Sequence, residues 1–295
     1  MESLTLRQLR YFDALAHEGH FGRAADRCAV SQPALSVQIK DLEASVGFAL
    51  FERGSRGVRL TSMGETFAVR ARDILRGVAD LGDWAATARS GRLDRLRLGV
   101  IPTIAPYLLP NLIGAFAKAH PSMDMHVRET VTPRLMTELS EGLIDAALVA
   151  LPLDDTTLTE VPLFEEQMVL VQHESRAGAP MVSAEALADM RLLLLEEGHC
   201  FRDQALSFCN INPRRPREGL DGSSLSTLVQ MVGAGIGVTL IPDMAVSVET
   251  RSAPVCITRF RAPAPTRTIA LVWRKTNPMG NTLRAFADVI RDVVA

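Results

Sequence analysis

Residues 31–47 read SQPALSVQIKDLEASVG, and this stretch contains the start, the buried face and the end of one helix. Ser31 suits the N-cap position because its hydroxyl can accept a hydrogen bond from a first-turn N–H, and Pro33 fits the first turn. Gly47 favours the left-handed conformation that often ends a helix. The apolar residues recur at helical spacing, at Leu35, Ile39, Leu42 and Val46. The stretch therefore predicts an amphipathic helix with well-defined ends.

The segments on either side extend this helix into a small domain. Residues 5–21 have apolar positions at helical spacing, and residues 22–30 predict a short second helix before a tight turn, so the three segments together predict a helix-turn-helix. FERGSRGVRLT, residues 51–61, has two Gly and three Arg between short extended pieces, which predicts a β-hairpin, or wing. A long amphipathic helix follows, from Thr61 or Ser62 to about Ser90.

The remainder of the chain has a different pattern. From Leu96 onward, apolar runs of strand length alternate with helical patterns, as in LRLGVI, DAALVA, MVLVQ, RLLLLEE, GVTLIP and TIALVW. This alternation predicts an α/β domain with mainly parallel strands. We therefore expect three parts: an all-α winged helix-turn-helix over residues 1–60, a linker helix over 61–91, and an α/β domain over 92–295.

Length and composition limit the class of protein. The 295 residues are 47% hydrophobic, which supports sizeable cores and excludes global disorder. The N-terminus, MESLTLRQLRYF, lacks the apolar core of a signal peptide, and the longest uncharged run, 222–242, is interrupted by polar residues, Gly and Pro. We therefore expect a cytoplasmic protein that does not associate with a membrane. Four Cys in such a chain are not a secretory disulfide framework.

Charge and helix geometry together permit binding to DNA. Residues 1–99 carry 15 Lys and Arg against 12 Asp and Glu, whereas the rest of the chain carries 17 against 22. In a helix-turn-helix the second helix meets base edges in the major groove, and wing arginines suit phosphates or a minor groove. Spacing alone leaves open a small helical packing domain with solvated arginines. The DNA-binding candidates are Ser31, Gln32, Pro33, Ser36, Gln38, Arg53, Arg56 and Arg59.

Three motifs in residues 6–65 occur in a specific order: FxRAA, SQPALSxQIxxLE and LFxRxxRxxxLTxxG. They resemble the winged helix-turn-helix of LysR-type transcriptional regulators, and later segments also fit that family. The resemblance implies a dimer formed through the linker helix, a tetramer that reads two half-sites of double-stranded DNA, and contact with RNA polymerase. It also implies a regulatory domain of two Rossmann-like halves, similar to a periplasmic binding protein: half I about 95–163 plus 268–295, and half II about 164–267.

GHCFRDQALSFC, residues 198–209, places two of the four Cys on one expected helix. Three interpretations compete. Cys200 and Cys209 can be small core residues, because free Cys is often buried and inert. They can bind a metal together with His199, but the spacing matches no zinc template and no second ligand pair lies nearby, so we expect neither a metal nor a cofactor. The third interpretation is redox chemistry.

Helix geometry gives the redox interpretation a physical basis. If residues 200–209 form one helix, the two Cα atoms are ~13 Å apart, whereas a disulfide needs them within roughly 7 Å. Oxidation would therefore be coupled to refolding of the segment. Cys200 lies at the expected helix start, where the dipole favours a thiolate, and His199 and Arg202 are adjacent. A peroxide would convert that thiolate into a sulfenic acid, with which Cys209 could condense.

Residues 198–209, with GVIPTIAPYLLP at 99–110 and PTRTIALVWR at 265–274, resemble the peroxide-sensing branch of the LysR-type family. The resemblance implies that Cys200 is the peroxidatic thiol and Cys209 the resolving thiol. Within the implied pocket an arginine would stabilise charge on the leaving oxygen, and hydroxyls and an imidazole would hydrogen-bond the peroxide. The implied peroxide pocket consists of Thr103, Thr132, His199, Asp203 and Arg267, with Thr130 as the alternative to Thr132.

We therefore expect a DNA-binding regulator, and not an enzyme, that senses hydrogen peroxide through a reversible Cys200–Cys209 disulfide and controls oxidative-stress defence genes. A dithiol donor of the thioredoxin or glutaredoxin type would reduce the disulfide. Cys28, in the short second helix, and Cys256, on an expected strand, are predicted to be structural thiols. The alternatives are a metabolite-sensing regulator with incidental cysteines, and a thiol peroxidase.

Overall fold

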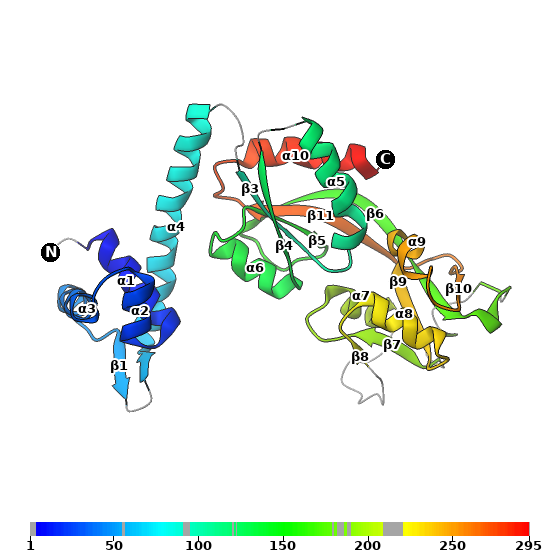
Figure 1. Ribbon diagram of the computed structural model, residues 1–295, viewed down its shortest axis with the longest axis horizontal. Coiled ribbons are helices and arrows are strands. Elements are labelled where there is room, and N and C mark those ends of the chain that lie inside the picture. The colour runs from blue at the N-terminus through cyan, green and yellow to red at the C-terminus, as the bar shows by residue number, and fades with distance from the viewer. Residues whose placement is uncertain are drawn as a thin grey trace. The chain divides into compact units, whose positions relative to one another are not determined.

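A computed structural model of the chain describes residues 4–54, 57–90, 95–119, 121, 123–178, 180–181, 186–187, 190–208 and 221–294. The chain divides into two compact units, Met1–Arg89 and Ser90–Ala295 (Figure 1). The first unit has one hydrophobic core and the second has two.

The first unit is a winged helix-turn-helix followed by a long helix. Ser31 Oγ accepts a hydrogen bond from the Ala34 N–H at 3.4 Å, and Gly47 follows the last helical residue with φ 82°, so α3 has the ends that the sequence predicts. β1 and β2 pair antiparallel as the predicted wing. The elements are α1 (Leu6–Glu18), α2 (Phe21–Arg27), α3 (Gln32–Val46), β1 (Phe51–Gly54), β2 (Gly57–Leu60) and α4 (Ser62–Ser90).

Aromatic packing joins the elements of this unit. The Phe12 ring centroid lies 5.1 Å from that of Phe51 and 4.9 Å from that of Phe67, so one ring connects α1, the wing and α4. A Cβ atom on Gly64 would clash with the Leu50 carbonyl oxygen, which explains a glycine in the first turn of α4. None of the helices in the described segments is both long enough and apolar enough to cross a membrane.

The second unit is an α/β domain built on one continuous sheet (Figure 1). The strand order is β4-β3-β5-β11-β6-β9-β7-β8, and β10 also pairs with β6. The elements are β3 (Arg95–Val100), α5 (Ala105–Ala119), β4 (Asp124–Glu129), α6 (Thr132–Ser140), β5 (Ala146–Ala150), β6 (Leu158–His173), η1 (Glu174–Arg176), β7 (Leu192–Leu195), α7 (Cys200–Phe208), β8 (Asp221–Gly222), α8 (Leu225–Gly233), β9 (Val238–Pro242), η3 (Asp243–Ala245), α9 (Val246–Glu249), β10 (Val255–Thr258), β11 (Thr266–Arg274) and α10 (Gly280–Val294).

The sheet is mixed, so the prediction of mainly parallel strands is wrong. β3 is parallel to β4 and β5, and β7 is parallel to β8 and β9. The long strands β6 and β11 are antiparallel to each other and to their other neighbours. Both contain continuous buried apolar runs, which are typical of parallel strands, so the composition did not reveal their direction.

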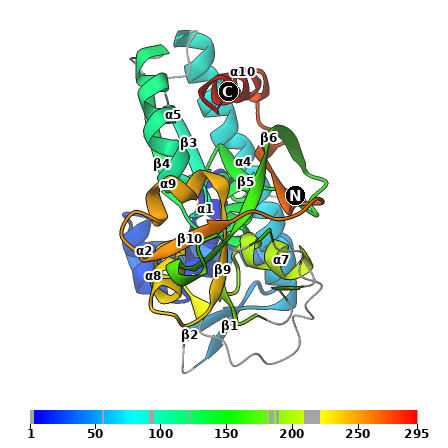
Figure 2. The same ribbon diagram turned by 90° about the vertical axis from the view of Figure 1, so that its right-hand side faces the viewer.

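Two hydrophobic cores lie along this sheet. Half I surrounds the first core and comprises β3, α5, β4, α6, β5, β11, α10 and the first part of β6. Half II surrounds the second core and comprises the rest of β6 with β7, α7, α8, β9, α9 and β10. β6 pairs with β11 from Leu158 to Gln167 and with β9 from Met168 to Val171, so one strand belongs to both halves (Figure 2).

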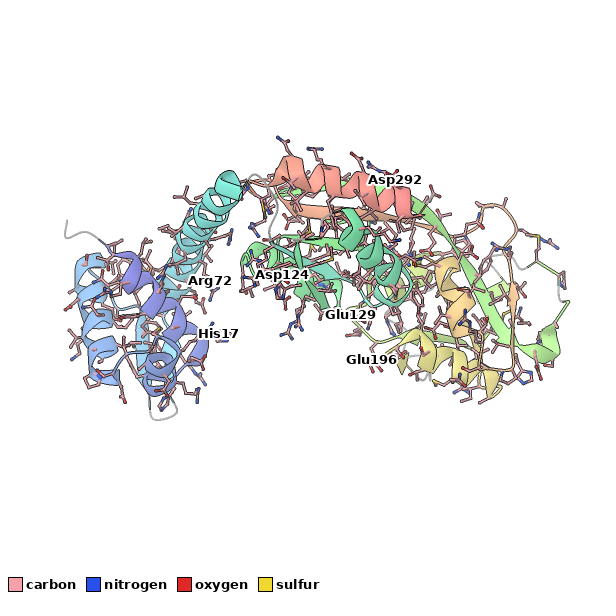
Figure 3. All side chains as sticks on the ribbon, turned by 45° about the horizontal axis from the view of Figure 1, so that its top comes forward. His17, Arg72, Asp124, Glu129, Glu196 and Asp292 are labelled. Carbon is pink, nitrogen blue, oxygen red and sulfur yellow. The ribbon has the colours of Figure 1, made fainter. Side chains whose placement is uncertain are left out.

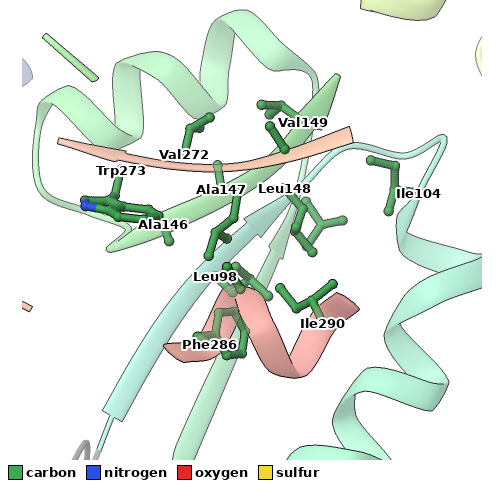
Figure 4. Close-up of a cluster of buried hydrophobic side chains, with 14 of the residues drawn as sticks. Leu98, Ile104, Ala146, Ala147, Leu148, Val149, Val272, Trp273, Phe286 and Ile290 are labelled. Atoms are coloured by element: carbon green, nitrogen blue, oxygen red, sulfur yellow. The ribbon is translucent and has the colours of Figure 1, made fainter. Parts of the chain in front are cut away.

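The core of half I packs between the sheet and its helices. Figure 4 shows Phe286 and Ile290 of α10 beside Leu98 of β3 and the side chains of β5. Phe286 also contacts Phe116 of α5, with ring centroids 4.3 Å apart. β4 is the edge strand of the sheet, and most of its residues are exposed. Figure 3 labels Asp124 and Glu129, the exposed first and last residues of this strand.

Candidate functional site

The turn before α7 places Cys200 at the start of a helix. β7 is fully buried, and the turn after it contains Gly198 at φ +94°, a conformation that L side chains rarely adopt. Glu196, labelled in Figure 3, is exposed at the start of this turn. α7 begins at Cys200, as the sequence predicts, and Cys200 is a half-buried free thiol. The thiol therefore lies at the positive end of the helix dipole.

Cys200 also lies at the boundary between the two halves. Its side chain packs against the core of half I, whereas Phe201, the next residue, is buried in the core of half II. Ala205 and Leu206, further along α7, belong to the core of half II as well. A change in the bonding of Cys200 would therefore act on the contact between the halves.

A buried guanidinium group is held close to this boundary. Arg267, on β11, is 3% exposed. Its Nη1 donates to Thr103 Oγ1 at 2.8 Å, and its Nη2 donates to the Thr103 carbonyl oxygen at 3.0 Å. Its Nε donates to Glu166 Oε2 at 2.9 Å, and Nη2 lies 2.8 Å from the same oxygen. The structure thus brings two of the predicted pocket residues, Thr103 and Arg267, into direct contact.

Glu166 is a residue of this network that sequence reasoning missed. It is 7% exposed on β6, and its Oε1 accepts the Met244 N–H at 2.9 Å while Oε2 holds Arg267. Its neighbour Glu165 is exposed. The signal in the sequence was the acidic pair Glu165 and Glu166 beside a buried strand segment. A fully buried carboxylate is rare unless a cation pairs with it, so burial of either residue would imply a basic partner.

The first turn of α6 lies next to the turn that precedes Cys200. A Cβ atom on Gly198 would come within 3.8 Å of Val131, the residue before α6. Thr132 is buried, and its Oγ1 has no hydrogen-bond partner among the described residues. Thr130 is half-buried, and its N–H donates to the Val100 carbonyl oxygen at 3.2 Å. The choice between Thr132 and Thr130 as a pocket residue stays a prediction.

His199 is half-buried directly before Cys200. Burial lowers the pKa of its imidazole, and the nearby charge of Glu196 offsets part of this effect. The imidazole is therefore mainly neutral at neutral pH and can accept a proton. Among the described residues, no hydrogen bond joins the side chain of His199 to Thr132 or to Arg267.

One pocket connects the thiol with the guanidinium. Cys200, Asp203 and Arg267 line this pocket, which has a volume of about 660 Å³. Gln204 lines it too: its Nε2 donates to the Leu151 carbonyl oxygen at 3.1 Å, whereas its Oε1 is buried with no partner in the described part of the chain. Gln204 was not among the predicted pocket residues, although it lies one helical turn after Cys200. The predicted residues outside the described lining of this pocket are Thr103, Thr132 and His199.

The other three cysteines differ in position. Cys209 lies outside the described residues, so its predicted role stays a prediction; α7 ends at Phe208. Cys28 was predicted to lie within the short second helix. The helix already ends at Arg27, so Cys28 is instead the C-cap of α2. Cys256 lies on β10, as predicted, and its Sγ donates to the His173 carbonyl oxygen at 3.4 Å. Burial raises the pKa of both the Cys28 and the Cys256 thiols.

The predicted DNA-binding residues lie on α3 and the wing. Ser31, Gln32 and Pro33 are exposed at the start of α3, and Ser36 and Gln38 are partly exposed in its first two turns. Arg59 is exposed on β2. The side chain of Arg53 and all of Arg56 lie outside the description. Within the described parts of the chain, no group of three or more His, Cys, Asp and Glu side chains could hold a metal ion.

Comparison with known proteins identifies the family. Residues 6–65 match the model of the bacterial regulatory helix-turn-helix protein, lysR family, and residues 89–295 match the model of the LysR substrate binding domain. The chain belongs to the LysR family. A relative in that family from Dickeya chrysanthemi, a hydrogen peroxide-inducible genes activator, is 40% identical over 291 residues, which cover 98% of this chain and 95% of the relative.

Solved structures of LysR family members are also similar. A full-length OxyR from Pseudomonas aeruginosa with a Cys-to-Asp substitution is 38% identical and aligns with a TM-score of 0.77, covering 99% of this chain and 96% of that one. A hydrogen peroxide-bound OxyR mutant from Corynebacterium glutamicum is 33% identical, with a TM-score of 0.67 and coverage of 100% and 94%. The fold of a LysR regulator, with a winged helix-turn-helix and a two-half α/β domain, is thereby confirmed.

Proposed function

We propose that this chain is a transcriptional regulator that senses hydrogen peroxide by oxidation of Cys200 and formation of a disulfide with Cys209. One observation carries the proposal: a free thiol at a helix N-terminus and a buried, immobilised guanidinium line the same pocket. The similarity to peroxide-inducible activators and to a peroxide-bound OxyR supports the same function.

The pocket supplies hydrogen bonds of the kind that a peroxide needs. Among the described residues, Nη1 of Arg267 uses one of its two N–H donors, on Thr103, so the other is available to a peroxide. Thr103 Oγ1 accepts from Arg267, so its own hydroxyl hydrogen is available for donation. Among the described residues, the buried Oε1 of Gln204 in the pocket wall lacks a partner, and a peroxide O–H could satisfy it.

The first chemical step oxidises the sulfur. The Cys200 thiolate attacks one peroxide oxygen, the S–O bond forms, and the O–O bond breaks. The second oxygen leaves as hydroxide and takes a proton to become water, so the products are a sulfenic acid and one water. Arg267 and Thr103 stabilise charge on the leaving oxygen, and the neutral imidazole of His199 can orient the peroxide or pass a proton. Asp203 is exposed on the pocket wall, and its part in this network stays a prediction.

The second step couples chemistry to shape. Cys209 follows the last residue of α7 directly, so a continued helix would separate the two Cα atoms by ~13 Å, well beyond the roughly 7 Å that a disulfide allows. Attack of the Cys209 thiol on the sulfenic sulfur, with loss of water, therefore requires α7 to unwind. Because α7 packs against both cores, its unwinding changes the contact between the halves.

The N-terminal unit carries the residues that would bind DNA. Ser31, Gln32 and Pro33 are presented for base contacts, and Arg59 for phosphates. We infer that residues 1–60, 61–91 and 92–295 form the DNA-binding domain, the linker helix and the regulatory domain. We also infer a dimer formed through the linker helix, a tetramer on two half-sites and contact with RNA polymerase. A dithiol of the thioredoxin or glutaredoxin type would reduce the disulfide.

Differential alkylation followed by mass spectrometry tests the proposal. Reduced full-length protein receives equimolar hydrogen peroxide, is quenched within seconds and is digested. The expected result is a linked Cys200–Cys209 peptide while Cys28 and Cys256 remain alkylatable, because burial raises the pKa of these two thiols. Oxidation of all four thiols at similar rates, or of none, would contradict a dedicated peroxide switch.

A further inference from the structure

The pocket next to Cys200 is much larger than hydrogen peroxide requires. Its volume is about 660 Å³. A water molecule occupies roughly 30 Å³ in the liquid, and hydrogen peroxide has only one heavy atom more. Pockets of about 300–1,000 Å³ with mostly apolar walls and a few polar groups are typical of sites for small organic ligands. Most of the pocket is therefore left over after a hydrogen peroxide has bound.

This pocket has both polar and apolar walls. The start of α7 contributes Cys200, Asp203 and Gln204, and the buried Arg267 lines the same pocket. The end of α7 contributes Phe208, about 12 Å along the helix from Cys200 at 1.5 Å per residue. Other apolar lining residues are Pro263, Ala264 and Pro265 from the segment before β11, and Leu151, Pro152 and Met168.

The apolar wall formed by Phe208 and Pro265 is held in place by packing and by a backbone hydrogen bond. Phe208 packs edge-to-face against Phe260, with ring centroids 5.3 Å apart, and Phe260 is buried in the core of half II. Pro265 is buried as well, and its carbonyl oxygen accepts the Met168 N–H at 2.9 Å. Two packed aromatic rings and a fixed proline segment would hold an apolar group without large rearrangement.

We propose that this pocket also admits organic hydroperoxides, R–O–O–H, with the hydroperoxide group at Cys200 and the apolar R group along Phe208 and Pro265. The inference rests on the proposed function and widens its oxidant class. The Cys200 thiolate attacks the terminal oxygen of R–O–O–H, the S–O bond forms, and the O–O bond breaks. The alkoxide RO⁻ leaves and takes a proton to become the alcohol R–OH. Sulfur is oxidised to the sulfenic acid, and the peroxide is reduced.

The test compares three oxidants on the reduced full-length protein. Hydrogen peroxide, tert-butyl hydroperoxide and cumene hydroperoxide are added separately, and the rate of loss of each alkylatable thiol is measured by mass spectrometry. We expect cumene hydroperoxide to oxidise Cys200 at least about tenfold faster than Cys28 and Cys256 in the same chain, since apolar contacts in a pocket are worth roughly 10–200-fold in rate.

A substitution at the exposed end of α7 separates the two oxidant classes. Ser207 lines the pocket beside Phe208 and is exposed, so Ser207→Trp adds an indole without burying a larger side chain in a core. It should slow cumene hydroperoxide by about tenfold or more relative to hydrogen peroxide in the same variant. Ser247→Trp, at an exposed position of α9 outside the pocket lining, is the matched control and should change neither rate.

The outcomes distinguish this inference from the function on which it rests. If hydrogen peroxide oxidises Cys200 rapidly but cumene hydroperoxide reacts no faster there than at Cys28, the organic site is refuted and the peroxide sensor stands. Equal slowing of both oxidants by Ser207→Trp would also refute it, because the apolar wall would then have no separate role. If no oxidant selects Cys200, the proposed function falls, and the inference falls with it.

Discussion

Glu166 and Arg267 stand directly opposite each other on β6 and β11, and their side chains approach to 2.8 Å although both are buried. The carboxylate also accepts the Met244 N–H, and the guanidinium also donates to Thr103. The pair therefore connects β6 and β11 to both halves of the domain. Buried charges are tolerated only when they are paired and hydrogen-bonded, and this pair meets both conditions.

Removing the carboxylate should therefore destabilise the protein. Glu166→Ala leaves a buried guanidinium without its counter-charge, and breaking a buried pair in this way costs about 3–5 kcal/mol. Urea or thermal unfolding of the regulatory domain within the full chain measures the loss. Glu165→Ala, at the exposed neighbouring position, is the control and should change stability by less than about 0.5 kcal/mol. Equal effects of the two substitutions would show that the buried pair has no special role.

Thr103→Val should slow the oxidation of Cys200 by hydrogen peroxide. Valine has nearly the shape of threonine, but it removes the Oγ1 atom that accepts from Arg267 at 2.8 Å and the hydroxyl that can donate to a peroxide. Loss of a positioned donor at a developing charge typically costs about 10²-fold in rate. Stopped-flow oxidation of the reduced protein gives the rate constant. Thr157→Val, at an exposed loop position, serves as control, and an unchanged rate in Thr103→Val would remove this residue from the reaction.

His199 should make folding stability depend on pH. Burial lowers the pKa of its imidazole below the ordinary 6.5, so the unfolded chain binds more protons than the folded chain below that pH. The contribution is fully present above about pH 6.5 and is lost as the pH falls through the lower pKa of the folded state. His199→Gln should flatten Tm against pH in this interval. Parallel curves for wild type and His199→Gln would contradict the assignment.

A second polar contact between the halves involves Tyr107 and Glu249. Tyr107 Oη, from α5 in half I, donates to Glu249 Oε1 at 2.7 Å, and Ser226 Oγ donates to Oε2 at 2.6 Å. Tyr107→Phe should lower the free energy of unfolding by about 1–3 kcal/mol, because it leaves a buried carboxylate oxygen short of a donor. Denaturant unfolding measures this loss, and a change within experimental error would exclude a stabilising contact.

Tyrosine titration provides an independent check of the same contact. Burial, together with the hydrogen bond to Glu249, raises the pKa of Tyr107 far above its ordinary value. Ultraviolet titration of the folded protein should therefore show no phenolate from Tyr107 in the ordinary range. Tyr107→Phe should leave the titration curve of the folded protein unchanged in that range, and loss of a titration step in this variant would contradict the buried contact.

Binding to DNA should respond differently to substitutions in α3 and in the wing. Arg59→Ala removes one exposed cation, so binding should weaken similarly on all sequences and the slope of log K against log salt should decrease by about one. Gln32→Ala should instead weaken specific binding by about 1–3 kcal/mol and leave the salt slope unchanged. Fluorescence anisotropy at several salt concentrations distinguishes the two patterns. Identical salt slopes for Arg59→Ala and wild type would exclude a phosphate contact.

The winged helix-turn-helix was predictable because its signals are local. The Ser31 cap, the Gly47 end and the apolar face of α3 are all short-range features, and the structure has each of them. Cys200 was placed at a helix start for the same reason. In the α/β domain the buried strands were recognisable from their apolar runs, whereas the edge strand β4 is exposed at five of its six positions and has no continuous apolar run.

Long-range relationships could not be read from the sequence. Glu166 lies 101 residues from Arg267, and only the antiparallel register of β6 and β11 makes them partners. Strand direction was misjudged because burial on both faces produces the same composition in either direction. Gln204 was missed because an amide one turn after a cysteine has no distinctive chemistry until its oxygen is seen buried with no partner among the described residues.

The place of β11 in the sheet also determines the order in which the domain can be completed during synthesis. Half I starts first along the chain, at β3, but its sheet needs β11 beside β5, and its core needs α10, the final helix. The core of half II, in contrast, is contained between Met168 and Phe260. A nascent chain that ends just before β11 therefore carries every buried residue of the second core, whereas the first core still lacks a central strand and a helix. Half I, whose first strand is translated before half II, is therefore the last half whose core can be completed.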